Sequence, residues 1–215
     1  LGHQDRFIRD AARVAIEHQP VDSWRDRALK ESKTKSAVQA LLALARVGSA
    51  DLQGEILASL GKISWNGLGR IQKLELLRVY AVTLARTGPP SGQLRDDLVA
   101  AWNPRVPSGD SLIDGDLLEL LTFLDAPKRP ERALSLLDKA STPKEQIGYA
   151  KSIRHIQSDW TPDLRERFFS WFVVAKSHPG GAAVASVIES MRNDAKIHLT
   201  EQETMLLGPL VNAKK

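Results

Sequence analysis

Two pairs of residues have the spacing of metal ligands. His155 and Asp159 are four residues apart, as are Asp194 and His198, and each pair falls in a segment expected to be helical. Residues four apart lie on one face of a helix, so each pair could hold one side of a metal ion. A zinc site needs three or four ligands, and local spacing supplies no third. We therefore predict no metal-ligating residue and no cofactor in this chain.

An acidic segment, DSLIDGDLLE, has the composition of a calcium loop, with Asp110, Asp114, Asp116 and Glu119. An EF-hand loop needs acidic residues at its first, third and fifth positions, followed by glycine, and this segment lacks that order. We predict instead that Asp110 or Ser111 caps the start of a helix.

The segment NGLGR places Gly67 and Gly69 in front of an expected helix. A phosphate-binding loop needs a preceding strand and either further glycines or a Lys-Ser/Thr pair, and none is present here. The chain also contains no Gly-x-Ser-x-Gly motif and no serine with a His and an acid in a known local pattern. We predict a plain helix start at this segment and no catalytic residue in the chain.

The aromatic residues could form a stacking surface for nucleic acid bases. The tryptophans are spread over the chain, at Trp24, Trp65, Trp102, Trp160 and Trp171. The segment RFFSWF is apolar on more than one face of a helix, and such a helix is normally deeply buried. We therefore predict that RFFSWF forms the core of the C-terminal part.

A lysine-rich connection, KESKTKSAVQ, contains Lys30, Lys33 and Lys35. It could contact phosphate or an anionic surface, but runs of charge are more often solvated. We predict a solvated turn at this connection.

Composition excludes several kinds of site. The 215 residues include no cysteine, which removes disulfides, covalent c-type haem, thiolate zinc sites and cysteine nucleophiles. The formal net charge is +4, and acidic and basic residues alternate along nearly every expected helix. A nucleic acid-binding protein usually concentrates its basic residues on one face, so we disfavour a nucleic acid partner.

The hydrophobic periodicity predicts helices throughout and no strand. Capping signals support this, with Thr142, Thr161 and Thr200 at helix starts and Gly48 and Gly88 after helix ends. The expected segments are 4–18, 22–32, 34–47, 50–63, 68–87, 91–102, 112–125, 130–140, 143–157, 162–177, 181–197 and 200–212.

Short turns between these segments predict antiparallel neighbours. Alternate segments start near residues 4, 34, 68, 112, 143 and 181, steps in the range of helix-hairpin repeats. We predict an all-α, HEAT/armadillo-like right-handed α-α superhelix of about six antiparallel helix pairs. It forms one array over 1–215 or two sub-arrays that divide near 103–111. An irregular helical bundle is the alternative.

The opening helix resembles the second helix of a HEAT repeat, with Asp5, Arg9, Ala11 and Ala12 in the corresponding places. In such helices, small residues permit close approach, and the Asp and Arg can bridge successive repeats.

Longer phrases extend the resemblance. DRFIRDAARVAIEHQPVDSW, QKLELLRVYAVTLARTGPP, PGGAAVASVIESMRNDA and, most specifically, WTPDLRERFFSWF resemble the HEAT-like segment of planctomycete and verrucomicrobial multidomain proteins. Those proteins also carry a dehydrogenase-like β-propeller and a c-type cytochrome module. This chain has no Cys-x-x-Cys-His motif, so the family's redox residues have no positions here.

The resemblance implies a non-catalytic scaffold, a fragment of a larger exported, periplasmic or otherwise extracytoplasmic protein. Its expected partners are a protein or neighbouring domains of the same parent chain, and we expect a monomer without a membrane span. The alternative function is a HEAT-like DNA glycosylase for alkylated bases, which would bind duplex DNA in a concave cationic groove using Trp, Arg and Asp.

Overall fold

The computed structural model describes residues 1–211, and these residues contain thirteen α-helices and four short 3-10 helices. No β-strand occurs within the described range. The predicted all-α class is therefore confirmed. No helix in that range is both long enough and apolar enough to cross a membrane.

Internal contacts divide the chain into two compact units, unit 1 from Leu1 to Ala100 and unit 2 from Ala101 onwards. Helix α6 (Gly92–Trp102) carries the boundary. The boundary lies just before 103–111, where the sequence allows a division between sub-arrays. A single array through both units stays a prediction.

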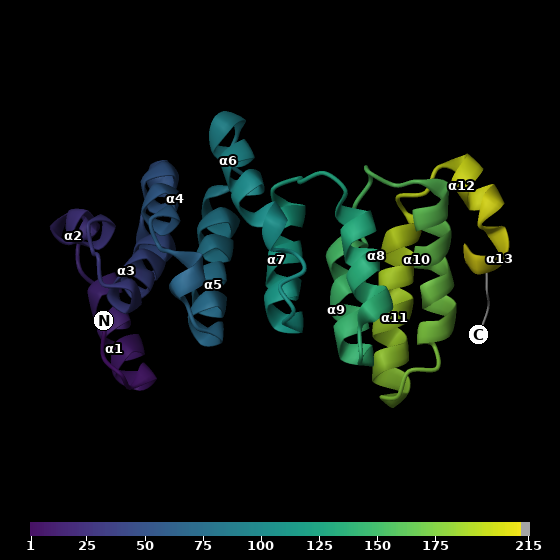
Figure 1. The fold of residues 1–215 in the computed structure, drawn as a ribbon, viewed down its shortest axis with the longest axis horizontal. Helices are drawn as coiled ribbons and strands as arrows, with labels where there is room; N and C mark the ends of the chain where they lie inside the picture. Colours follow the sequence, from purple (N-terminus) through teal and green to yellow (C-terminus); the bar gives the residue numbers. More distant parts are fainter. Residues whose placement is uncertain (212–215) are drawn as a thin grey trace. The chain divides into compact units, whose positions relative to one another are not determined.

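Unit 1 is built around one central helix. Its helices are α1 (Arg6–Glu17), α2 (Arg25–Leu29), α3 (Thr34–Val47), α4 (Gln53–Gly61) and α5 (Arg70–Thr87), and its 3-10 helices are Val21–Ser23, Ala50–Leu52 and Trp65–Gly67. Helix α3 packs against α1, α2, α4 and α5, and α2 also contacts α4 (Figure 1). In this unit, helices therefore contact the helix two places along as well as their immediate neighbours.

Small side chains make this packing close. Helix α3 buries Ala37, Ala40, Ala43, Leu44 and Ala45. Because alanine extends only one carbon beyond the backbone, neighbouring helices can approach the α3 axis closely. The core of unit 1 is therefore made mainly of backbone, methyl groups and leucines.

Helix α1 sits at the edge of unit 1 and has no buried residue. The Asp5 carboxylate accepts from the backbone N–H groups of Phe7 and Ile8, so it caps its own helix rather than bridging repeats. Arg9 does bridge, since its Nη2 lies 3.5 Å from Oε1 of Glu75 on α5. Polar contacts thus fix α1 more than apolar burial does.

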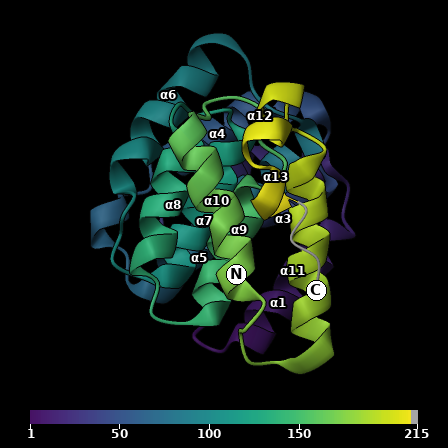
Figure 2. The same cartoon turned by 90° about the vertical axis from the view of Figure 1, so that its right-hand side faces the viewer.

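Unit 2 is built from the helices that follow α6. Its helices are α7 (Ser111–Phe123), α8 (Arg129–Lys139), α9 (Pro143–Ile153), α10 (Pro162–Ala175), α11 (Gly181–Lys196), α12 (Glu201–Leu206) and α13 (Gly208–Val211), with a 3-10 helix at Asn103–Arg105. Helix α9 contacts α7, α8 and α11, and α10 contacts α8, α11 and α13. Figure 2 shows α10 and α11 side by side. The two-place contact of unit 1 recurs here as α7–α9–α11 and α8–α10.

The core of unit 2 is aromatic. Phe168, Phe169 and Phe172 are 0 % exposed and Trp171 is 7 % exposed. The ring centroids of Phe168 and Phe172 are 4.8 Å apart, and those of Trp171 and Phe172 are 5.0 Å apart. The prediction that RFFSWF forms the core of the C-terminal part is confirmed.

Every expected helical segment has a helical counterpart, and the differences have local causes. The segment 22–32 breaks at Trp24, whose φ of −137° lies outside the helical region. The segment 200–212 is divided into α12 and α13 at Leu207, where the following Pro209 has no N–H with which to continue the first helix. The end of that segment, residue 212, lies outside the described residues.

The expected helix starts are confirmed in detail. The Thr142 hydroxyl accepts from the backbone N–H of Glu145, and the Thr200 hydroxyl accepts from that of Glu203. The Thr161 hydroxyl accepts from the N–H of Leu164. These side chains satisfy helix N–H groups that have no partner within the helix.

Candidate functional site

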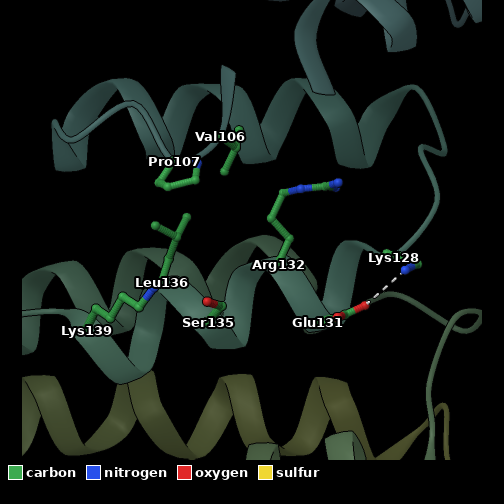
Figure 3. A pocket seen from close by; sticks show the side chains of 8 residues that line it. All are labelled: Val106, Pro107, Lys128, Glu131, Arg132, Ser135, Leu136 and Lys139. Carbon is green, nitrogen blue, oxygen red and sulfur yellow. Dashed lines mark ion pairs between the residues drawn. The ribbon is translucent and has the colours of Figure 1, made fainter. Parts of the chain in front are cut away.

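A cavity with several charged side chains in its lining lies in unit 2, along one side of α8 (Figure 3). It has a volume of about 250 Å³. Its lining consists of the short segment before α7 and one face of α8: Val106, Pro107, Lys128, Glu131, Arg132, Ser135, Leu136 and Lys139.

The sequence of α8 explains why these side chains share a face. Lys128, the N-cap residue, and Arg132, Ser135 and Lys139 within α8 are separated by four, three and four residues, the spacing of one helical stripe. The opposite side of α8 buries Ala133, Leu134 and Leu137 in the aromatic core. We call the four polar residues the α8 basic stripe. Because the apolar face of α8 is buried in the core, the α8 basic stripe lies on the side of the helix that lines the cavity.

Charge at the cavity is unbalanced toward positive. Three cations, Lys128, Arg132 and Lys139, meet one carboxylate, Glu131. Nζ of Lys128 lies 3.9 Å from Oε2 of Glu131, the contact drawn as a dashed line in Figure 3. Within the described residues, Arg132 and Lys139 form no salt bridge, although the charge of Glu131 acts on Arg132. The cavity therefore keeps a net positive charge.

Arg132 is the most constrained of these cations. Figure 3 shows its side chain rising from α8 into the space between the helices, with the guanidinium end turned away from Val106. Its Nη1 donates a long hydrogen bond of 3.3 Å to the Pro127 carbonyl oxygen. Burial lowers the pKa of the Arg132 guanidinium, and the charge of Glu131 opposes this shift. An arginine pKa stays far above neutrality, so the cavity contains a partly dehydrated positive charge with N–H donors to spare.

Three of the four residues with metal-ligand spacing are brought together in unit 2. Nε2 of His155 lies 3.7 Å from Oδ2 of Asp194, and the rings of His155 and His198 meet edge to face at 6.0 Å. Asp194 is already engaged, since its Oδ2 accepts from Nε of Arg154 at 2.9 Å. Asp159 lies with Arg129 instead. In the described part of the chain, no group of three His, Cys, Asp or Glu side chains is placed to hold a metal ion.

The acidic segment forms a helix start, and the predicted cap is confirmed. Oδ1 of Asp110 accepts from the backbone N–H groups of Leu112 at 3.0 Å and Ile113 at 3.2 Å. Asp114 is 3 % exposed and accepts from the Ser108 N–H at 2.6 Å. These two carboxylates hold the segment before α7 onto the helix.

The glycine segment also behaves as expected of a helix start. Gly69 is the N-cap of α5, and its N–H donates to Oε1 of Gln72 at 3.0 Å. Gly67 ends the preceding 3-10 helix.

The tryptophans serve different local roles. Trp171 is buried and its Nε1 donates to Oε1 of Gln146 at 3.0 Å. The guanidinium of Arg165 lies 4.2 Å from the Trp160 ring centroid, and Nε1 of Trp160 donates to the Ile156 carbonyl at 2.8 Å. Trp102 is 4 % exposed. In unit 2 these indoles pack and tie helices together.

In unit 1, Trp24 donates from Nε1 to the Gln19 carbonyl at 3.4 Å, and Nζ of Lys73 lies 5.0 Å from the Trp65 ring centroid. The lysine-rich connection has Lys30 and Lys33 exposed and Lys35 half-buried.

A second polar cavity of about 540 Å³ lies next to that connection. Lys30 and Lys62 line it together with the hydroxyl-bearing residues Ser32, Thr34, Ser59 and Ser64. Glu31 lines the same cavity, so its charge is closer to balance than that of the cavity beside α8.

Sequence reasoning missed the α8 basic stripe, although a signal was present. The four, three, four spacing of Lys128, Arg132, Ser135 and Lys139 could have been recognised as one helical face. Arg129 obscured this face, because it is an arginine like Arg132 and yet is buried, at 6 % exposed. Comparisons of the chain with protein-family models, curated proteins and solved structures gave no match.

Proposed function

We propose that this chain is a non-catalytic, HEAT-like helical scaffold that binds a protein partner or positions neighbouring domains of a larger exported protein. The observation that carries the proposal is the contact pattern within each unit. In unit 1, α3 contacts α1 and α5 while α2 contacts α4; in unit 2, α9 contacts α7 and α11 while α8 contacts α10. Two rows of alternating helices are the arrangement that stacked helix hairpins produce.

The use of charged side chains supports a scaffold role. Arg129 contacts Asp125 and Asp159, Arg154 contacts Asp194, and Arg9 contacts Glu75. These contacts join helices or the loops between them. Side chains that could otherwise act as acids or bases thus serve to hold neighbouring elements in register.

The observations favour the scaffold over a DNA glycosylase. That enzyme class would need a cationic groove lined by tryptophan and aspartate. Trp102 and Trp171 are instead buried, and the Trp160 ring is covered on one side by Arg165, whose guanidinium also contacts Glu203.

Site-specific photo-crosslinking tests the scaffold proposal in the cells that make the protein. A photoreactive residue would replace Ile71 of unit 1, which is 69 % exposed, or Val187 of unit 2, which is 50 % exposed. We expect one of these positions to crosslink reproducibly to a single protein species or to another domain of the same polypeptide, identified by mass spectrometry.

A parallel assay measures release of alkylated bases from duplex DNA by the purified chain. Base release, or failure of both positions to crosslink to anything, would contradict the scaffold proposal. Salt-dependent binding to DNA without base release would replace it with a nucleic acid-binding role.

A further inference from the structure

The α8 basic stripe has the length of a short extended peptide. Lys128 is the N-cap residue just before α8, and Arg132 and Lys139 within α8 are seven residues apart, about 10 Å along the axis. In an extended peptide, side chains two residues apart project from the same side and are about 6.7 Å apart. The first and fifth side chains of an extended pentapeptide are therefore about 13 Å apart, enough to reach along the helical part of the stripe from Arg132 to Lys139.

The cavity at the middle of the stripe suits a carboxylate. Arg132 uses one long hydrogen bond, to the Pro127 carbonyl, and a guanidinium can donate two parallel hydrogen bonds to one carboxylate. Ser135 lies one turn away on the same face and adds a hydroxyl. The cavity volume of about 250 Å³ is below the range of about 300–1,000 Å³ typical of sites for drug-sized ligands. A side-chain carboxylate suits this volume better than a nucleotide does.

Apolar groups complete the surface. Val106 and Pro107 form the wall that faces α8, and Leu136 lies between the charged residues of the stripe. An extended peptide with acidic side chains on one side and apolar side chains on the other could contact both sets at once. A fully acidic polymer such as nucleic acid would leave the apolar wall without a partner.

We propose that the α8 basic stripe binds an acidic segment of a protein partner in extended conformation, with one carboxylate seated on Arg132. This inference rests on the proposed scaffold function and specifies the chemistry of the partner. Glu131 weakens binding of the peptide, because its carboxylate lies next to the Lys128 ammonium group and repels an incoming carboxylate. The stripe is thus a recognition surface whose strength is set by the balance of four charges.

Fluorescence anisotropy on the full chain tests this proposal. The probe is a labelled pentapeptide with glutamate at its first, third and fifth positions and valine between them, titrated at low salt. We expect Arg132→Gln to weaken binding about tenfold or more, because it removes a charged double hydrogen bond. Arg132→Lys is expected to recover only part of the affinity, since lysine keeps the charge but loses the planar fork.

Two further variants make the result specific. Glu131→Gln is expected to strengthen binding several-fold, which a general loss of structure could not do. Lys144→Gln is the matched control, because it makes the same change of charge at an exposed position on α9 that does not line the cavity. We expect it to leave the dissociation constant within twofold of the unmodified chain.

Other outcomes would overturn the proposal. Competition by inorganic phosphate at the concentration of the peptide would indicate a simple anion site. Tighter, Arg132-dependent binding of duplex DNA would indicate a nucleic acid surface. Loss of the peptide interaction while crosslinking from Ile71 or Val187 persists would reject the acidic-peptide site and leave the scaffold proposal standing.

Discussion

The two units share a leucine-rich core but differ in what is added to it. In unit 1 the buried alanines gather on one helix, α3, and Ala43 at its centre is 0 % exposed. Unit 2 uses large rings, with Phe168, Phe169 and Phe172 fully buried, and adds buried cations such as Arg165, whose side chain is 3 % exposed. Helix pairs can therefore be joined either by close backbone approach or by interlocking aromatic side chains, and the two cores are expected to fail under opposite changes of volume.

Removal of volume tests the aromatic core. Phe168→Ala is expected to destabilise unit 2 by about 3–5 kcal/mol, because it removes buried surface and leaves a cavity. Urea unfolding followed by circular dichroism measures the loss, and hydrogen exchange assigns it to a unit. The control is Val174→Ala on the same helix, which is 63 % exposed and is expected to change stability by less than about 0.5 kcal/mol. Equal effects of the two variants would contradict the aromatic-core account.

Addition of volume tests the small-residue core. Ala43→Leu is expected to destabilise unit 1 by about 1–3 kcal/mol, because three extra carbon atoms must displace neighbouring helices. The same substitution at the exposed Ala81 of α5 is the control and should leave the urea midpoint nearly unchanged. If Ala43→Leu proved neutral, the close approach of helices around α3 would be wrong.

A pH series tests the ion pair of unit 2. Burial opposes ionisation of Glu203, but hydrogen bonds from Thr200 and the charge of Arg165 outweigh it and lower the pKa of the carboxyl. A depressed carboxyl pKa contributes stability above the unfolded value, near 4.5, and loses it as the pH falls through the folded value.

Glu203→Gln is therefore expected to cost about 1–2 kcal/mol at pH 7. In acid the two proteins should converge, because the unmodified side chain also becomes neutral. Thermal melts at pH 7 and pH 3 measure the difference. A gap that stays constant with pH would show that the carboxylate charge does not matter to Arg165.

The smallest expected effect concerns the edge of unit 1. Asp5→Ala removes the cap of α1 and is expected to cost about 1 kcal/mol or less. Since α1 has no buried residue, we expect the loss to be local. Hydrogen exchange should speed up within Arg6–Glu17 while the amides of α3 stay protected. Faster exchange throughout unit 1 would mean that α1 belongs to its cooperative core.

Local signals predicted much of the fold. Helix positions followed from periodicity, and the caps at Asp110, Thr142 and Thr200 followed from residue types that act within one turn. The burial of RFFSWF was also predictable, because its rings cover more than one face. These features depend on residues close together in sequence, for which the spacing alone determines which side chains contact each other.

The candidate site was not predictable, because it depends on which face of α8 is covered. Arg129 and Arg132 lie on one helix, but Arg129 turns toward Asp125 and Asp159 while Arg132 turns toward the cavity. That choice follows from packing of α8 against α9 and α10. The approach of His155 to Asp194, which are far apart in sequence, is equally a product of long-range packing.

Contact between helices two places apart within each unit also constrains how such a unit can change in length. Loss of one helix would move every following helix into the other row, and its apolar face would then point to solvent. Loss or duplication of a hairpin leaves both rows in order. Natural variants of this protein are therefore expected to differ in length by whole hairpins, that is, by even numbers of helices.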